Sequence, residues 1–201
     1  MINEVIKIES DVTKLIKETL VSYYKGMYND LSESESEYIF VYKEEAFTSK
    51  ICNSYVDFAV SYISSECGHE VICHEIKISE EDFNSKYGSN FYGTKNYYVV
   101  PQYMTEYVTR KIDNNALYNN IGLIEVGEKD GYIYLERKRW AKQFKPNEIT
   151  YSLMDNLIDN GIYIGEGNIE LKRNTFKFFN SCNVFENHQL IKDMIRVSNN
   201  K

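Results

Sequence analysis

The chain has 201 residues, of which 43% are hydrophobic and 26% charged, ordinary proportions for one folded domain in water. Its formal net charge of −7 argues against a protein that coats nucleic acid through positive charge, but suits an enzyme whose site carries its own acids. No apolar run approaches the ~20 residues of a membrane span, and the charged N-terminus does not resemble an export signal. The four cysteines show no Cys-x-x-Cys spacing, so we expect free thiols in a reducing cytoplasm.

The first part of the chain predicts one helix and three strands. Asp11 is placed to cap a helix whose apolar residues recur at helical spacing as far as Met27. Three strand-like segments follow at 38–42, 55–63 and 71–78, and a turn over 64–70 separates the last two. We therefore expect these strands to be connected as a meander, which disfavours a fold wound from βαβ units.

The rest of the chain alternates between helical and strand patterns. Ser79 has the character of a helix cap. The further expected elements are a strand at 97–100, a helix at 104–112, a hairpin of strands 121–126 and 132–137, and a helix from Asn147 or Glu148 to Gly161. Together they predict an α/β fold with a mixed central β-sheet flanked by helices. We assign residues 1–162 to one domain and 163–201 to a C-terminal extension packed on it.

The triplet Glu75-Ile76-Lys77 is the most informative local feature of the sequence. Side chains of a strand alternate between its two faces, so Glu75 and Lys77 should point the same way. Their neighbours in 71–78 are apolar, and charges in such a run are expensive unless they pair or bind something. If Asp57 lies beside Glu75 on the preceding strand, two carboxylates and an ammonium converge. An exposed edge strand with a cross-strand ion pair would explain the triplet differently, but it would alternate more cleanly.

This combination suits metal-dependent hydrolysis of a phosphodiester. Mg²⁺ or Mn²⁺ needs only a few oxygen ligands from the protein, and Asp57, Glu75 and the backbone carbonyl of Ile76 could supply them. Lys77 could orient or deprotonate the attacking water. A further acid is expected from the first strand, where Glu44 and Glu45 are candidates. Strand parity places these two on opposite faces, so at most one should join the site.

The segment 55–126 resembles the PD-(D/E)XK nuclease superfamily, in particular the MmcB-like DNA-repair proteins and their phage relatives. The matching stretches cover about a third of the chain and are Tyr-Val-Asp57-Phe-Ala-Val, His-Glu75-Ile-Lys77-Ile-Ser79, Glu81-Asp82-Phe83, Asn90-Phe-Tyr-Gly93, Asn96-Tyr-Tyr-Val-Val-Pro101 and Ile121-Gly122-Leu-Ile-Glu-Val126. The resemblance implies a restriction-endonuclease-like core and a Mg²⁺-dependent deoxyribonuclease with catalytic residues Asp57, Glu75 and Lys77. It also implies Glu45, or else Glu44, as the upstream acid.

Two further clusters bear on binding. A basic run near Trp140, together with two lysines around the 87–93 loop, predicts contacts to nucleic acid; its alternative is a solvated hairpin edge. The candidates for these contacts are Lys86, Lys95, Arg137, Arg139, Trp140 and Lys142. Cys67, His69, Cys73 and His74 suggest zinc, but their spacings fit no common finger, and Cys73 and His74 should face opposite ways.

The sequence-based hypothesis is therefore a cytoplasmic nuclease acting on DNA, in repair, recombination or phage DNA metabolism, with no membrane partner. Two alternatives stay open on the same fold. One is a catalytically silent module that binds nucleic acid or protein, and the other is an anti-defence or regulatory protein that acts on a host partner. The sequence does not decide whether the substrate is DNA or RNA, or whether it is single- or double-stranded. It also leaves open whether the enzyme is an endonuclease or an exonuclease, and whether it forms a homodimer.

Overall fold

The computed structural model of the chain describes residues 10–33, 38–47, 54–64, 68–85, 90–165, 169–170 and 172–174. The elements in chain order are α1 (Asp11–Glu33), β1 (Tyr38–Phe47), β2 (Tyr55–Ser64), β3 (Gly68–Ile76), α2 (Glu80–Asn84), β4 (Lys95–Pro101), η1 (Gln102–Met104), α3 (Thr105–Asp113), η2 (Ala116–Tyr118), β5 (Gly122–Lys129), β6 (Tyr132–Arg139), α4 (Glu148–Asn160) and β7 (Ile162–Ile164). Within these ranges, no helix is both long and apolar enough to cross a membrane.

The strands form one mixed seven-stranded sheet in the order β6-β5-β4-β3-β2-β1-β7. Strands β1, β2 and β3 are antiparallel neighbours, so the predicted meander is confirmed. Strands β3, β4 and β5 are parallel, and their connections carry α2 and α3. The α/β class with helices flanking a mixed sheet is thereby confirmed.

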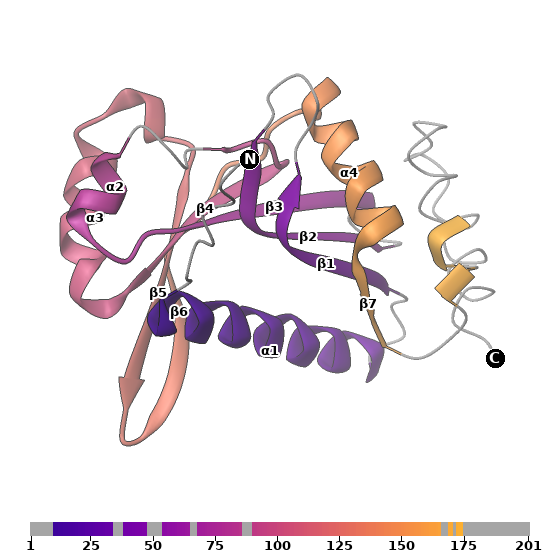
Figure 1. Ribbon diagram of the computed structural model, residues 1–201, viewed down its shortest axis with the longest axis horizontal. Coiled ribbons are helices and arrows are strands. Elements are labelled where there is room, and N and C mark those ends of the chain that lie inside the picture. Colours follow the sequence, from indigo (N-terminus) through magenta and orange to yellow (C-terminus); the bar gives the residue numbers. More distant parts are fainter. Residues whose placement is uncertain are drawn as a thin grey trace, which may run out of the picture.

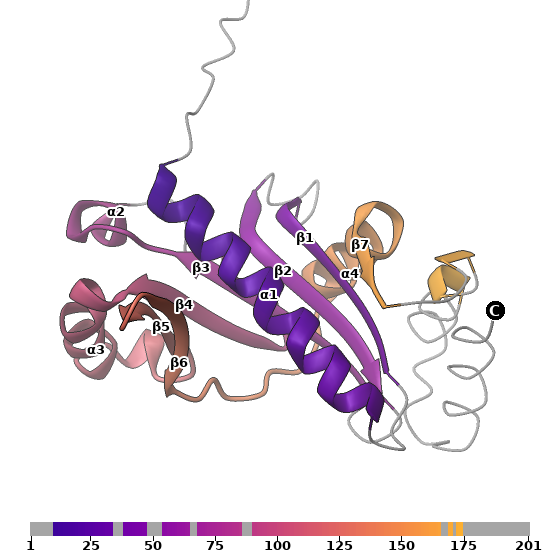
Figure 2. The same ribbon diagram turned by 90° about the horizontal axis from the view of Figure 1, so that it is seen from below.

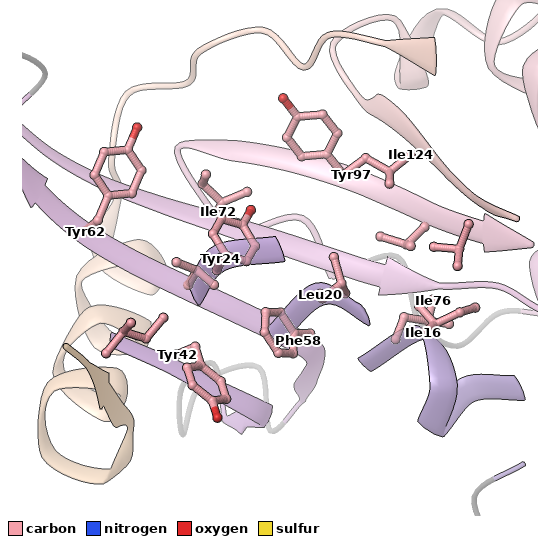
Figure 3. Packing of buried hydrophobic residues seen from close by; sticks show 14 residues of the cluster. Ile16, Leu20, Tyr24, Tyr42, Phe58, Tyr62, Ile72, Ile76, Tyr97 and Ile124 are labelled. Atoms are coloured by element: carbon pink, nitrogen blue, oxygen red, sulfur yellow. The ribbon is translucent and has the colours of Figure 1, made fainter. Parts of the chain in front are cut away.

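Helix α1 covers one face of the sheet, and in Figure 2 it lies in front of the sheet and runs in nearly the same direction as β1 and β2. The helix turns Ile16, Leu20 and Tyr24 inward, and each is at most 3% exposed. Figure 3 shows these side chains meeting the rings and branched chains of the sheet, among them Phe58 and Ile72. Burying a side chain of this size stabilises a fold by about 1.5–3 kcal/mol. This apolar interface therefore fixes the position of α1 on the sheet.

The other face carries two separate apolar clusters. Helix α4 packs on β1–β3 through Leu153, Leu157 and Ile158, whereas α2 and α3 pack on β4 and β5 around Tyr98. Figure 1 shows α4 and the α2–α3 pair above different parts of the sheet. Since Glu75 pairs with Tyr98 across β3 and β4, it lies at the boundary between the two clusters.

Local capping explains where several helices begin. The backbone N–H of Thr13 donates to Oγ of Ser10 at 3.1 Å, so Ser10 caps α1 and the prediction of Asp11 is wrong by one residue. Ser79 caps α2 as predicted, and Asn147 forms a capping box with Thr150 at the start of α4.

The predicted hairpin of β5 and β6 is confirmed, and it closes through Asp130 and Gly131. Both turn residues have positive φ, at 53° and 79°, as a two-residue type I′ turn requires. Strand β7 pairs with β1 through residues 162–164, so the sheet continues past the predicted domain end at 162. The predicted extension lies mostly outside the described residues.

Candidate active site

Strands β2 and β3 bring Asp57 and Glu75 together. Phe58 of β2 pairs with His74 of β3. Because the two strands are antiparallel, the residue before Phe58 lies opposite the residue after His74, which places Asp57 opposite Glu75. The N–H of Ile76 donates to Oδ2 of Asp57 at 2.9 Å, and the Asp57 carboxyl group is close enough to Glu75 to raise the pKa of that residue. The convergence expected from strand alternation is therefore present, on the face opposite α1.

Lys77 completes this cluster at the end of β3. Its N–H donates to the carbonyl of Val99 at 3.0 Å, which extends the ladder one residue beyond the strand. Its side chain is 4% exposed, and Nζ lies 3.4 Å from Oδ1 of Asp82. The ammonium is also close enough to Glu75 to oppose the rise of that residue's pKa.

Asp82 and Asn90 hold the cluster in place, and sequence reasoning assigned neither of them a role. Oδ2 of Asp82 accepts the N–H of Ile78 at 3.3 Å while its other oxygen faces Lys77, so the first turn of α2 fixes both. The N–H of Asn90 donates to Oε1 of Glu75 at 3.3 Å, and its Nδ2 donates to the carbonyl of Tyr55 at 2.8 Å. The helix-start pattern after Lys77 could have indicated Asp82, but no local pattern links Asn90 to Glu75.

The loop that carries Asn90 follows β3 at close range. Oγ1 of Thr94 bonds both the N–H and the carbonyl of Val71, at 3.0 and 2.9 Å. A Cβ on Gly93 would lie 2.7 Å from the Val71 carbonyl oxygen and 2.9 Å from Sγ of Cys73. Only glycine permits this approach. The loop is thus anchored to the strand whose Glu75 it contacts.

Glu75 is an unusual acid because it is 1% exposed beside a second carboxyl group. Burial and the nearby charge of Asp57 raise the pKa of Glu75 to about 8, against the smaller opposing effects of Lys77 and the Asn90 N–H. Glu75 therefore retains its proton at neutral pH.

The same pair has the donor chemistry of a divalent-cation site. A hard cation can replace the proton of Glu75, since its charge offsets the burial and the Asp57 charge that raise the pKa of Glu75. Among the described residues no group of three or more His, Cys, Asp and Glu gathers around one point. A Mg²⁺ or Mn²⁺ ion would then take two carboxylates and complete its shell with water. The carbonyl of Ile76 as a further ligand stays a prediction.

Glu44 and Glu45 do not behave as strand parity predicts. Both carboxylates lie 3.9 Å from Nζ of Lys17, a residue of α1 whose side chain is 4% exposed. Glu45 has φ of 48°, which breaks the strand alternation and turns consecutive side chains toward one ammonium. The prediction that Glu44 and Glu45 lie on opposite faces of the strand is therefore wrong. Glu45 lies opposite Asp57 in the register of β1 and β2, and its ion pair is with Lys17 of α1. Among the described residues, Glu45 does not join Asp57 and Glu75 in a group of three acids that could hold a metal ion.

The nucleic-acid candidates on β6 divide between the two faces of the sheet. A β-bulge opposite Leu123 and Ile124 makes Lys138 the extra residue. The guanidinium of Arg137 stacks on Trp140 at 3.9 Å and donates to the hydroxyl of Tyr23 on α1. Arg139 instead forms an ion pair with Asp113 of α3 at 2.6 Å. These contacts give both arginines a role within the fold.

The remaining candidates have mixed surroundings. Nζ of Lys95 lies 2.8 Å from both carboxylate oxygens of the buried Glu70, so Lys95 is part of a half-buried ion pair. Lys142 is exposed and its N–H donates to the Asn120 carbonyl, while Trp140 is 72% exposed. Lys86 lies outside the described residues. Whether any of the six contacts nucleic acid stays a prediction.

The Cys/His cluster does not assemble in the part of the chain that is described. His74 Nε2 bonds the hydroxyl of Tyr24 at 3.0 Å on the α1 face, while Cys73 is buried in the α4 cluster. Cys73 and His74 therefore lie on opposite faces of β3, as strand alternation predicts. Burial lowers the pKa of His74 to about 3, so its ring is a neutral core group. Cys67 lies outside the described residues.

Comparison of the chain with protein-family models, with curated proteins and with solved structures found no match. The functional argument therefore rests on the residues and on their geometry.

Proposed function

We propose that the protein is a metal-dependent nuclease that hydrolyses phosphodiester bonds, and we expect DNA to be its substrate. One observation carries the proposal: the carboxyl groups of Asp57 and Glu75 come from opposite positions of β2 and β3, beside the buried Lys77 at the end of a central strand. Purely structural acids in a sheet are usually paired one-to-one with cations. Here the acids outnumber the single ammonium, and a divalent cation is the partner that balances them.

Each residue of the Asp57–Glu75–Lys77 cluster has a role that fits such a reaction. Asp57 and Glu75 would hold Mg²⁺ or Mn²⁺, which when bound offsets phosphate charge and acidifies a water molecule. Lys77 orients that water or stabilises charge on the phosphate, and Asp82 keeps its ammonium in position. The N–H groups of Ile76 and Asn90 fix one carboxylate each, so both oxygen donors are oriented before the substrate arrives.

The fold supports the same proposal. The order of α1, the β1–β3 meander, α2 and β4 is the order that the sequence pattern predicts, and it is compatible with the restriction-endonuclease-like core that the resemblance implies. The Asp57–Glu75–Lys77 cluster lies where the apolar cluster under α4 meets the apolar cluster under α2 and α3.

A substrate screen tests the proposal. Purified protein is incubated with single-stranded DNA, duplex DNA and RNA in Mg²⁺, Mn²⁺ or EDTA, and products are resolved on denaturing gels. We expect cleavage of at least one substrate with a metal ion and none in EDTA. The matched control is Lys138→Ala, which removes a lysine of the β5–β6 hairpin that pairs with Glu125 and Glu136 outside the cluster and should leave cleavage unchanged. Cleavage that persists in EDTA, or its absence with every substrate and metal, would refute the proposal.

A further inference from the structure

Arg137 and Arg139 lie on the same strand, β6, but their charges have different partners. Arg139 forms an ion pair with Asp113 at 2.6 Å and also donates to the carbonyl of Asn119 at 3.1 Å. Arg137 points to the α1 face, where its Nη2 donates to the hydroxyl of Tyr23 at 3.2 Å. Within the described ranges, the guanidinium of Arg137 has no carboxylate partner and no other hydrogen bond. The charge of Arg137 is therefore uncompensated in this part of the chain.

The Arg137 side chain is partly buried, but one end of its guanidinium stays accessible. Nε is buried and has no hydrogen-bond partner. Nη1 has no partner among the described residues either, but it is not buried. A partly buried charge without a counter-ion costs free energy, and a bound anion relieves that cost. The accessible end of Arg137 is thus a receptor for an anion, and its planar fork suits the paired oxygens of a phosphate.

Trp140 adds an aromatic face beside this cation. Cζ of Arg137 lies 3.9 Å from the centroid of the Trp140 ring, so one face of the indole carries the guanidinium. The ring is nevertheless 72% exposed, which leaves its other face open. The chain directly after it is anchored, because Ala141 packs against the core under α1 and the N–H of Lys142 donates to the carbonyl of Asn120 at 3.0 Å. Trp140 is therefore an exposed ring with restricted freedom, which loses little entropy when a planar group stacks on it.

We propose that Arg137 and Trp140 form a binding site for a phosphate ester that carries an unpaired nucleobase. The phosphate is held at the Nη end of Arg137, and the base stacks on the open face of Trp140. A carboxylate of a peptide would use the cation and leave the ring unused, so the two groups together favour a nucleotide. The ligand is either a free nucleotide or part of a single strand of nucleic acid. Because this site lies on the α1 face and Asp57 and Glu75 lie on the other, it does not rest on the proposed nuclease function.

Intrinsic fluorescence measures this binding directly, because Trp140 is the only tryptophan of the chain. The full chain is titrated in EDTA with AMP, adenosine, inorganic phosphate or a single-stranded oligoadenylate, under excitation at a wavelength that adenine does not absorb. We expect saturable quenching by AMP and at least about tenfold weaker binding of adenosine, which lacks the phosphate. Inorganic phosphate should compete with AMP without quenching. Tighter binding of the oligoadenylate than of AMP would assign the site to a nucleic-acid strand, and equal affinity would assign it to a free nucleotide.

Arg137→Gln should weaken AMP binding by about tenfold, because it removes the cation and keeps a polar group for the hydroxyl of Tyr23. The matched control is Arg110→Gln, which removes an exposed arginine of α3 that pairs with Glu106 and should leave binding unchanged. Thermal melts check that both variants fold, and if Arg137→Gln does not, the comparison of AMP with adenosine on the wild type decides alone.

No quenching by AMP, equal affinity for AMP and adenosine, or an equal loss of AMP binding in the two variants would overturn the inference. The titrations contain no metal ion, so these results are independent of metal-dependent cleavage, which the substrate screen tests separately.

Discussion

Two buried glutamates of β3, five positions apart, have opposite surroundings. Glu70 accepts hydrogen bonds from the hydroxyl of Tyr62 and from Nζ of Lys95, so one carboxylate meets one ammonium and one hydroxyl. Glu75 meets a second carboxyl group, a backbone N–H and an ammonium that is also paired with Asp82. The charges around Glu70 balance each other, whereas those around Glu75 leave an excess of one negative charge. Burial alone does not distinguish them; the balance of charges does.

Enzyme activity should show the largest difference between the two glutamates. Asp57→Asn, Glu75→Gln and Lys77→Ala should each lower the metal-dependent cleavage rate by about 10²–10⁴-fold, because they remove metal binding or water activation. Glu70→Gln should leave the rate per folded molecule within a few-fold of the wild type. Single-turnover cleavage assays on proteins matched for circular dichroism check this, and full activity in all three site variants would place the active site elsewhere.

The pH dependence of stability should show the next largest difference. Because the folded-state pKa of Glu75 is raised from 4.5 to about 8, its protonated form contributes stability that is complete below pH 4.5 and is lost as pH rises through 8. In EDTA, the free energy of unfolding should fall by about 2–3 kcal/mol from pH 6 to pH 8 relative to Glu75→Gln. Urea titrations at several pH values measure it. Parallel curves for the two proteins would mean that Glu75 is ionised throughout.

Replacing Lys95 or Lys77 should change the free energy of unfolding by smaller amounts. Lys95 should matter more than Lys77 for stability, whereas Lys77 should matter more for activity. Lys95→Met leaves the buried Glu70 without its cation and should cost about 2 kcal/mol of unfolding free energy. Lys77→Met should cost about 1 kcal/mol or less, since Asp82 is 38% exposed and water can solvate it. Urea denaturation midpoints at pH 7 compare them. A larger loss in Lys77→Met would make its ion pair structural.

Much of this fold follows from local pattern, but the details of the site depend on contacts that are distant in sequence. Strand alternation correctly places Glu75 with Lys77, and turn chemistry gives the Asp130–Gly131 hairpin. The positive φ of Glu45 was missed because parity arguments assume regular backbone. The Asn90 contact with Glu75 depends on how a loop folds back on β3, and the pairing of β7 with β1 spans most of the chain. Neither leaves a periodic signal in the sequence.

The central claim is that Asp57 and Glu75 form a cation site and not a structural acid pair. Asn at position 57 keeps an oxygen for the Ile76 N–H and removes the charge that opposes Glu75 ionisation. Thermal melts of wild type and Asp57→Asn, in EDTA and in millimolar Mn²⁺, therefore test the claim most directly. We predict that Asp57→Asn is neutral or stabilising in EDTA, and that Mn²⁺ raises the melting temperature of the wild type but not of the variant. A destabilised Asp57→Asn, with no effect of Mn²⁺ on either protein, would contradict the claim.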